Sequence, residues 1–197
     1  MFTGLIETLG TVRHIERRSG SLRLTIAAPL ANELKIDQSV SIDGACQTVV
    51  RCDHDTFSVI AIPETLERTT LGDLKVNDKV HLERGMMLSD RFDGHLVQGH
   101  VDGVADIVRI ERRGESKEVW FRASPEYARY IVEKGSVSLA GISLTVAKQR
   151  NREFAVDLIP HTLEHTNTGT WRVGMKANLE VDLLAKYIDK LLAERLH

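Results

Sequence analysis

Short stretches in which apolar and polar residues alternate recur along most of this chain. The clearest are rich in β-branched side chains and lie at 21–26, 39–42, 56–62, 79–83, 105–110, 117–121 and 153–159. A period of two places the apolar residues on one face, as in a strand with one side buried. Turn residues separate the stretches at regular spacing, which is typical of small antiparallel barrels. The pattern therefore predicts an all-β protein.

Helical patterns are short in the body of the chain. We expect helical turns at 28–34 and 124–132. One more is expected after each Ile-Pro pair, starting at Pro63 and at Pro160, because proline is well suited to the first position of a helix.

The carboxyl-terminal tail has a longer helical repeat. Asp182 can cap a helix that runs to Arg195. Its apolar residues fall on one face and are Leu183, Leu184, Tyr187, Ile188, Leu191 and Leu192. This stripe covers the open end of a barrel or is buried between subunits, and we favour the oligomer contact.

One segment of the chain occurs twice. Residues 41–83 and 138–180 align without a gap at an offset of 97, and 17 of the 43 aligned positions are identical. The likeness continues upstream, where 2–7 resembles 97–102 at an offset of 95. We interpret this as an internal duplication with modules at 1–90 and 94–182, followed by a helix at 183–197. Two such modules can face each other across a pseudo-twofold axis and hold two copies of one ligand.

Charge and cysteine content exclude several classes of protein. The net charge is −2 with acids and bases spread along the chain, unlike the basic surface of a nucleic-acid-binding protein. No apolar run approaches the roughly 20 residues that span a bilayer, and the first residues do not resemble a signal peptide. Cys46 and Cys52 on one strand would lie about 20 Å apart, too far for a disulfide. We expect a reduced, cytoplasmic protein that binds neither nucleic acid nor membrane.

The segment 94–103 is the densest in unusual residues, with three glycines and two histidines. The duplication calls for a strand here, and glycine in a strand often marks close approach of a ligand or another backbone. In a strand, His95 and His100 would point to opposite faces and could not ligate one metal. For either histidine alone, a structural hydrogen bond is the alternative to a role in a pocket.

Cys46 and Ser143 occupy the same position of the two copies, just after a glycine at the start of a strand. Thr48 and Thr145 follow two residues later and face the same way. A pocket lined by a small polar side chain and a threonine hydroxyl suits a polar, planar heterocycle. The structural alternative is a small buried cysteine and a serine in a turn.

The third repeated element is Ile-Pro followed by Glu64-Thr65 in one copy and His161-Thr162 in the other. Backbone groups around such a proline are free to bind a ligand, although the element can equally be a plain helix start. A phosphate loop, a dinucleotide-binding glycine pattern and a Ser/His/Asp order are all missing from the sequence.

Together these motifs resemble the riboflavin synthase family. The resemblance covers essentially the whole chain in order and is carried by 1–7, 44–49, 63–72, 82–84, 94–103, 130–136, 141–146 and 158–162. It implies two tandem, pseudo-symmetric six-stranded antiparallel Greek-key barrels and a carboxyl-terminal helix that assembles a homotrimer. Each active site would lie between the amino-terminal barrel of one subunit and the carboxyl-terminal barrel of its neighbour.

The family's reaction is the dismutation of two molecules of 6,7-dimethyl-8-ribityllumazine. A four-carbon unit is transferred, which gives riboflavin and 5-amino-6-(ribitylamino)pyrimidinedione, without a metal or another cofactor. The ring itself is the electron sink, so the protein mainly orients the substrates, transfers protons and stabilises charge. Association with lumazine synthase is left open by the resemblance.

The resemblance also implies two binding pockets. The amino-terminal pocket would use Gly4, Leu5, Ile6, Cys46, Gln47, Thr48, Ile60, Ala61, Ile62, Pro63, Glu64, Thr65, Gly99, His100 and Val101. The carboxyl-terminal pocket would use Lys134, Ser143, Leu144, Thr145, Asp157, Leu158, Ile159, Pro160, His161 and Thr162. We expect His100 and Ser143 nearest to proton transfer, with Cys46 as a supporting contact.

One position departs from the family pattern. The family usually has an aspartate, proposed to take part in catalysis, where this chain has Ala140, whereas the first copy keeps Asp43 at the equivalent place. A carboxylate essential as a base would be missing here. The alternative to an active synthase is therefore a non-catalytic lumazine- or flavin-binding relative of the antenna type.

Overall fold

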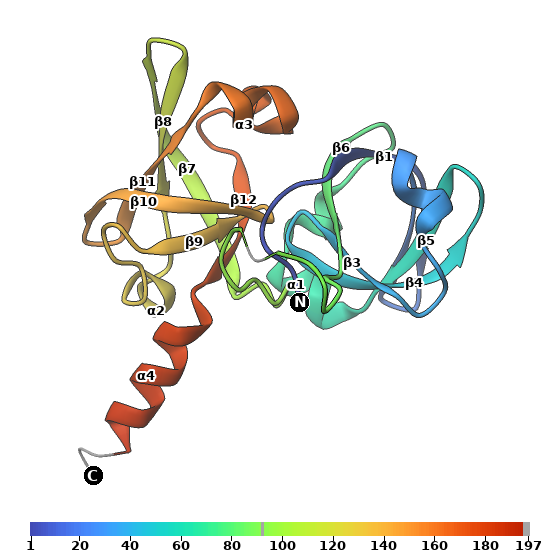
Figure 1. Cartoon of the computed structure of the whole chain (residues 1–197), viewed down its shortest axis with the longest axis horizontal. Helices are drawn as coiled ribbons and strands as arrows, with labels where there is room; N and C mark the ends of the chain where they lie inside the picture. The colour runs from blue at the N-terminus through green and yellow to red at the C-terminus, as the bar shows by residue number, and fades with distance from the viewer. Residues whose placement is uncertain (92, 195–197) are drawn as a thin grey trace.

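Two closed β-barrels stand side by side, and one helix projects from the second barrel (Figure 1). The computed structural model describes residues 1–91 and 93–194. The N-barrel consists of β1 (Thr8–Arg18), β2 (Ser21–Ala27), β3 (Ser39–Ile42), β4 (Ala45–Cys52), β5 (Thr56–Ala61) and β6 (Lys79–Arg84). The C-barrel consists of β7 (Gly103–Arg113), β8 (Ser116–Arg122), β9 (Ser136–Leu139), β10 (Ile142–Arg150), β11 (Glu153–Leu158) and β12 (Lys176–Val181).

The two barrels have the same topology. Strands follow one another around the N-barrel in the order β1-β2-β5-β4-β3-β6, and β7-β8-β11-β10-β9-β12 is the same order one module later. All strand pairs are antiparallel, and the pairing of β2 with β5 and of β8 with β11 makes the connections of the Greek-key type. The predicted fold class, two tandem six-stranded barrels with a terminal helix, is confirmed.

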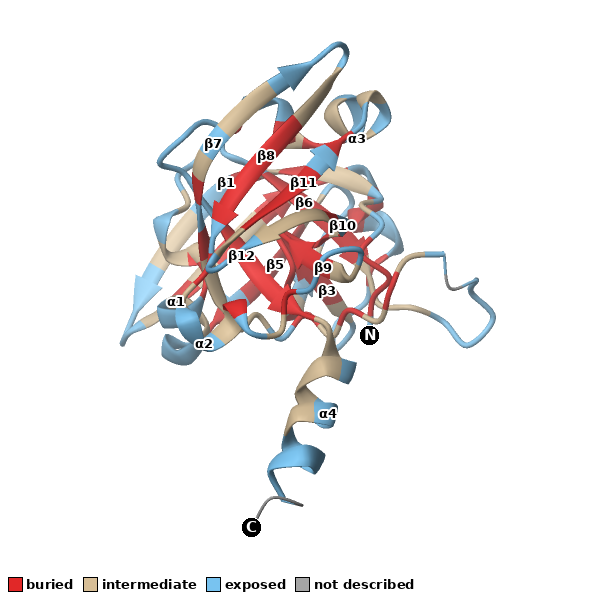
Figure 2. Ribbon diagram, turned by 90° about the vertical axis from the view of Figure 1, so that its left-hand side faces the viewer, coloured by how far each residue is buried: buried red, intermediate tan, exposed pale blue. Residues whose placement is uncertain are grey.

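Strand alternation builds a separate core in each barrel. In β2, the side chains of Leu22, Leu24 and Ile26 are fully buried, while the residues between them are half-exposed. Figure 2 shows the buried segments concentrated in the strands of both barrels. Burial of these apolar faces away from water is the main stabilising term of each barrel.

The short helices form close to the predicted places. A 3₁₀ turn, η1, covers Pro29–Glu33, and α2 covers only Pro125–Ala128, shorter than the expected 124–132. Helices α1 (Pro63–Arg68) and α3 (Pro160–His165) follow the two Ile-Pro pairs as predicted. Each is followed by a 3₁₀ turn, η2 at Thr70–Asp73 and η3 at Asn167–Thr170.

Helix α4 (Leu183–Ala193) begins as predicted, with the Asp182 carboxylate accepting a hydrogen bond from Leu184 N at 2.9 Å. The predicted end at Arg195 lies outside the described residues. The apolar side chains of the helix do not cover the barrel end, because Leu184, Tyr187, Ile188, Leu191 and Leu192 are all exposed. The helix projects away from the C-barrel (Figures 1 and 2).

The expected strand at 94–103 is wrong. Before β7 begins at Gly103, the one β-bridge of this segment is an isolated bridge between Val97 and Phe2. The backbone N–H groups of Gln98 and Gly99 instead donate to the carboxylate of Glu180. Their hydrogen bonds are thus satisfied without a neighbouring strand.

The barrels meet at two tight turns. Asp43-Gly44 joins β3 to β4, and Ala140-Gly141 joins β9 to β10, and all four residues have a positive φ, between 46° and 84°. Such two-residue hairpins require the left-handed region at both positions. A Cβ atom on Gly44 would lie 2.6 Å from the N atom of Gly141, so the two turns touch backbone to backbone. The pseudo-twofold axis of the duplication passes through this contact.

Candidate functional site

The segments that precede the two barrels exchange places. We call residues 1–7 the first arm and residues 97–102 the second arm. They cross at the bridge between Phe2 and Val97, whose backbone groups form two hydrogen bonds of 2.7 and 3.1 Å. Beyond the crossing, the glycine of each arm contacts the barrel of the other module.

Each arm is anchored by one buried glutamate. The Glu83 carboxylate accepts hydrogen bonds from Thr3 N, Thr3 Oγ1 and Gly4 N at 2.6 to 3.0 Å. Glu180, its counterpart, accepts from the N–H groups of the second arm at 2.7 and 2.9 Å. Burial raises the pKa of both carboxyl groups, and the hydrogen bonds to the arms oppose this effect.

The arms bring Gly4 to Ser143 and Gly99 to Cys46. Ser143 N donates to Gly4 O, and Cys46 N donates to Gly99 O, each at 2.8 Å. A Cβ atom at either glycine would come within 2.7 Å of the Cβ of its partner. We call the region around Cys46 the N half-site and the region around Ser143 the C half-site. Gly4, expected in the amino-terminal pocket with Leu5 and Ile6, therefore lies at the C half-site, and Ile6 packs against the core of the C-barrel.

The N half-site contains a cavity of about 490 Å³. Six expected residues line it, namely Cys46, Glu64, Thr65, Gly99, His100 and Val101. The sequence reasoning did not identify five further polar or charged lining residues, which are Arg68, Thr69, Gln98, Asp102 and Lys186. Arg68 forms an ion pair with Glu64 at 2.5 Å, one helical turn apart on α1.

The C half-site brings together two side chains from distant parts of the chain. His95 Nδ1 lies 2.7 Å from Ser143 Oγ. Burial lowers the pKa of His95, so its imidazole is neutral at neutral pH and can accept the serine proton. His100, which the resemblance placed in the amino-terminal pocket, lines the N half-site of the same chain. The histidines of segment 94–103 were recognised as candidate site residues. The assumed strand geometry did not reveal that His95 is the one that faces Ser143.

On α3, His161 and His165 replace the ion pair of α1. Their rings stack at a centroid distance of 4.1 Å, and His165 Nδ1 lies 2.8 Å from the carbonyl oxygen of His161. A ring nitrogen that faces a carbonyl oxygen must carry the proton, so His165 donates through Nδ1. Pro160 and Thr162 are half-exposed beside this pair.

The remaining expected residues divide according to strand alternation. Seven of them are exposed and face outward, namely Thr48, Ile60, Ile62, Pro63, Thr145, Asp157 and Ile159. Buried in the barrels are Gln47, Ala61, Leu144 and Leu158. Gln47 donates a 2.6 Å hydrogen bond to the carbonyl oxygen of Cys46, which satisfies its amide where the second copy has a leucine. Lys134 is exposed in a turn with φ of 67°.

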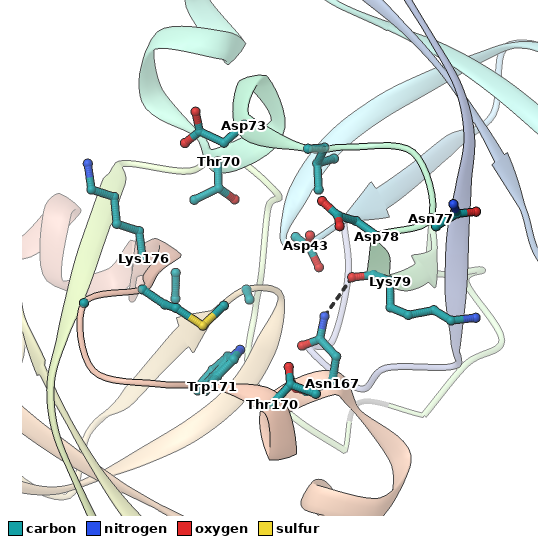
Figure 3. Close-up of a pocket in the computed structure, with 15 residues that line it drawn as sticks. Asp43, Thr70, Asp73, Asn77, Asp78, Lys79, Asn167, Thr170, Trp171 and Lys176 are labelled. Atoms are coloured by element: carbon teal, nitrogen blue, oxygen red, sulfur yellow. Dashed lines mark hydrogen bonds between the residues drawn. The ribbon is translucent and has the colours of Figure 1, made fainter.

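A second cavity lies between the barrels and is not part of either half-site. It has a volume of about 610 Å³ and is bounded by η2 and β6 on one side and by η3 and β12 on the other (Figure 3). Asp43 lies in it with Asp78 nearby, and the Asn167 side chain donates across it to the carbonyl oxygen of Lys79 at 2.8 Å. We call this space the interbarrel cleft.

Two titratable groups are buried at the interbarrel cleft. Burial raises the pKa of Asp43 from 3.8 to about 7, although a 2.8 Å hydrogen bond from His81 N opposes it. Burial lowers the pKa of His81 from 6.5 to about 4. His81 Nε2 accepts from Asn167 N, so Nδ1 carries the proton and donates to the carbonyl oxygen of Ala140 at 2.9 Å. The 3.5 Å approach of His81 to Asp43 is therefore not an ion pair.

Ala140 lines the interbarrel cleft together with Asp43. The side chain that this chain lacks relative to the family would thus enter the cleft, at the place equivalent to Asp43. It would not enter the hydrogen-bonded pair of His95 and Ser143. Ala140 therefore leaves the contact between His95 and Ser143 unchanged.

Among residues 1–91 and 93–194, no three His, Cys, Asp or Glu side chains are placed to hold one metal ion. In the same part of the chain, every helix is too short or too polar to cross a membrane. Cys46 and Cys52 are both free.

Comparisons with known proteins relate the whole chain to one group. The lumazine binding domain family matches twice, at residues 3–85 and 98–182. The chain is 39% identical over 196 residues to the riboflavin synthase of Actinobacillus pleuropneumoniae, which covers 99% of this chain and 91% of that protein. It is 41% identical over 198 residues to the riboflavin synthase of Mycobacterium bovis, with 98% of each chain covered.

Solved structures with the same fold include complexes with small molecules. LumP complexed with 6,7-dimethyl-8-(1'-D-ribityl) lumazine has a TM-score of 0.83 at 21% sequence identity, covering 92% of this chain and 99% of that chain. LumP complexed with riboflavin gives a TM-score of 0.83 at 22% identity and the same coverage. At 21–22% sequence identity, these structures show only that the fold is shared.

Proposed function

The chain belongs to the riboflavin synthase family, with two lumazine binding domains, and we propose that it makes riboflavin from two molecules of 6,7-dimethyl-8-ribityllumazine. One lumazine molecule gives up a four-carbon unit and leaves as 5-amino-6-(ribitylamino)pyrimidinedione. The other accepts the unit and becomes riboflavin.

The exchange of arms is the observation that carries this proposal. It gives the chain two equivalent half-sites. In each of them a glycine carbonyl oxygen of an arm accepts a 2.8 Å hydrogen bond from the backbone N–H of Cys46 or Ser143. Two copies of one substrate need two such places, related by a pseudo-twofold axis so that the molecules can be antiparallel. The half-sites also differ in the polar groups that they offer, as donor and acceptor roles require.

The reaction needs a proton removed from the C7 methyl group of one lumazine and an electrophilic C7 on the other. We propose that His95 and Ser143 act together in the C half-site, since neutral His95 can take up the serine proton at 2.7 Å. Cys46 and His100 would serve the N half-site, where both line one cavity. Glu64 and His161, at equivalent positions, are proposed to bind a ribityl chain or a pyrimidinedione edge.

Turnover of purified protein with 6,7-dimethyl-8-ribityllumazine, followed by riboflavin fluorescence, tests the proposed function. We expect Ser143→Ala and His95→Gln each to lower kcat by about 10²-fold, the usual contribution of one positioned proton-transfer group. The double variant should lose little more than either single variant, because the two residues act as one unit. His54→Gln, in the exposed turn after β4, is the matched control and should keep the wild-type rate.

Two outcomes would count against this assignment. Wild-type protein that binds the lumazine without forming riboflavin would make the chain an antenna-type binding protein. Full activity of both single variants would remove His95 and Ser143 from the proton-transfer step.

We also propose a homotrimer in which an N half-site of one subunit faces a C half-site of the next. Three isoleucines expected in the two pockets, Ile60, Ile62 and Ile159, are exposed in the single chain. The exposed apolar face of α4 supplies a second surface that burial between subunits would stabilise. The two free cysteines support a reducing, cytoplasmic location. Nothing on the described surface singles out a contact for lumazine synthase, so that partner is not proposed.

Replacing Ile188 and Leu191 by aspartate should prevent assembly, because the new charges would be buried in the helix contact. We expect a monomer in sedimentation-velocity runs and at least tenfold lower turnover, since each half-site then lacks its partner. Lys190→Asp places the same side chain on the polar face of α4 and should leave the trimer intact. An active monomer would show that one chain completes the site alone.

A further inference from the structure

Lys186 connects α4 to the second arm. Its Nζ lies 2.7 Å from Asp102 Oδ1, and the other oxygen of the same carboxylate accepts a 2.9 Å hydrogen bond from Val181 N. Asp102 is the last residue of the second arm and directly follows Val101, which lines the N half-site with His100. One carboxylate therefore joins this arm to the end of β12 and to the second turn of α4.

The first arm has an equivalent contact built from different parts. Glu7 accepts from Arg84 N at 2.6 Å and from the Arg84 guanidinium at 2.8 Å. In that module both donors belong to one residue at the end of β6. In the second module the backbone donor stays at the end of the barrel, but the cation comes from the helix. Of the two arms, only the second therefore has an ion pair whose cation comes from α4, so only its ion pair depends on where the helix lies.

The Lys186 contact is the more shielded of the two. The side chains of Lys186 and Asp102 are 28% and 15% exposed, compared with 39% and 33% for Arg84 and Glu7. An ion pair shielded from water is less weakened by solvent and salt than one on the open surface. Lys186 also lines the N half-site cavity itself, together with Cys46 and His100.

Helix α4 is held on the C-barrel by few contacts. Besides the Lys186 contact, Asp189 pairs with Arg129 and accepts a 3.0 Å hydrogen bond from the Tyr130 hydroxyl. Its apolar face stays exposed in the single chain. The placement of Lys186 therefore depends on how the helix is docked.

We propose that Lys186 is a positioning residue that holds the second arm, and with it His100 and Val101, in the N half-site. This rests on the proposed function of that site. Through the same contact, burial of the α4 face between subunits stabilises the position of the arm, so assembly and the shape of the N half-site are coupled.

Lys186→Met tests the proposal, because methionine keeps much of the aliphatic chain and removes the charge. Binding of 6,7-dimethyl-8-ribityllumazine is measured by fluorescence titration, alongside KM, kcat and the sedimentation coefficient. We expect KM and the dissociation constant to rise about tenfold with kcat within about twofold and assembly unchanged. Lys186→Arg should recover most of the affinity. Lys190→Met, one turn further along α4, is the matched control and should behave as wild type.

Asp102→Asn supplies an independent check on the contact. If Lys186 acts through Asp102, Lys186→Met in the Asp102→Asn background should change KM by less than about twofold. Unchanged KM in Lys186→Met, loss of the trimer in that variant, or an equal effect of Lys190→Met would each overturn the proposal. If wild-type protein neither binds nor converts the lumazine, the proposed function itself fails, which the wild-type titration reveals before any variant is compared.

Discussion

Replacing Asp43 with asparagine is expected to raise the free energy of unfolding by about 4 kcal/mol at pH 8. The Asp43 carboxyl is buried at the interbarrel cleft, where its pKa rises from 3.8 to about 7. A difference of this size between the folded and unfolded protein corresponds to about 4 kcal/mol. Asparagine keeps the oxygen that accepts from His81 N and tolerates the positive φ at this position, but it carries no charge.

The sign of this effect follows from the raised pKa. Below pH 3.8 the carboxyl is protonated in both states, and the substitution should make no difference. As the pH rises towards 7, the unfolded chain loses the proton first, so the Asp43 carboxyl lowers the free energy of unfolding progressively more. Above about pH 7 the full difference should be present.

Chemical denaturation at a fixed protein concentration between pH 3.5 and pH 8 measures this prediction. Asp37→Asn is the matched control, because Asp37 also has a positive φ, of 70°, but is exposed. It separates the backbone preference of asparagine from the removal of a buried charge. An equal gain in both variants, or a gain independent of pH, would contradict the explanation.

The duplication predicted much of this architecture because it repeats both local patterning and turn chemistry. Alternation in segments such as 21–26 identified the strands, and the two Ile-Pro pairs identified α1 and α3. Cys46 and Ser143 were predicted as equivalent positions, and the structure places each beside a glycine of the opposite arm.

Sequence reasoning failed where the two modules exchange segments. The family resemblance placed Gly4 in the amino-terminal pocket, whereas the crossing at Phe2 and Val97 carries it to Ser143. A sequence pattern reports the conformation of a segment, not the barrel against which it packs. The same crossing explains why His95 faces Ser143.

The position of Ala140 could not be predicted for a related reason. The sequence singles out this position only because the family has an aspartate there, and the tight turn directs Ala140 to the pseudo-twofold axis. There its carbonyl oxygen accepts from His81, and the equivalent carbonyl of Asp43 accepts from Asn178 Nδ2 at 2.8 Å. The pair of turns is therefore held by one histidine and one asparagine in equivalent places.

Asn178 predicts what replacing His81 will do. Its side-chain oxygen accepts from Thr70 N at 2.7 Å, as His81 Nε2 accepts from Asn167 N at 3.1 Å. His81→Asn should therefore keep both hydrogen bonds across the interbarrel contact, with little change in stability at pH 7. On acidification the wild-type histidine lowers the free energy of unfolding by about 3 kcal/mol, and the variant should not show this decrease.

The sign again follows from the pKa, which falls from 6.5 to about 4 on folding. Above pH 6.5 the ring is neutral in both states and its contribution to stability is complete. As the pH falls towards 4, the unfolded chain takes up the proton first, and the folded state loses stability relative to it. His81→Leu, which leaves the carbonyl of Ala140 and the N–H of Asn167 without this partner, should destabilise the protein at every pH instead.

His81 and Asp43 act in opposite directions over the same pH range, so their effects largely cancel in the wild-type protein. Replacing one of these residues should therefore reveal the pH dependence of stability that the other one causes. The stability of Asp43→Asn should increase between pH 4 and pH 6.5 because His81 remains, and the stability of His81→Asn should decrease between pH 4 and pH 7 because Asp43 remains. Denaturation profiles with slopes of the same sign in the two variants would refute the assignment of both pKa values to burial at the interbarrel cleft.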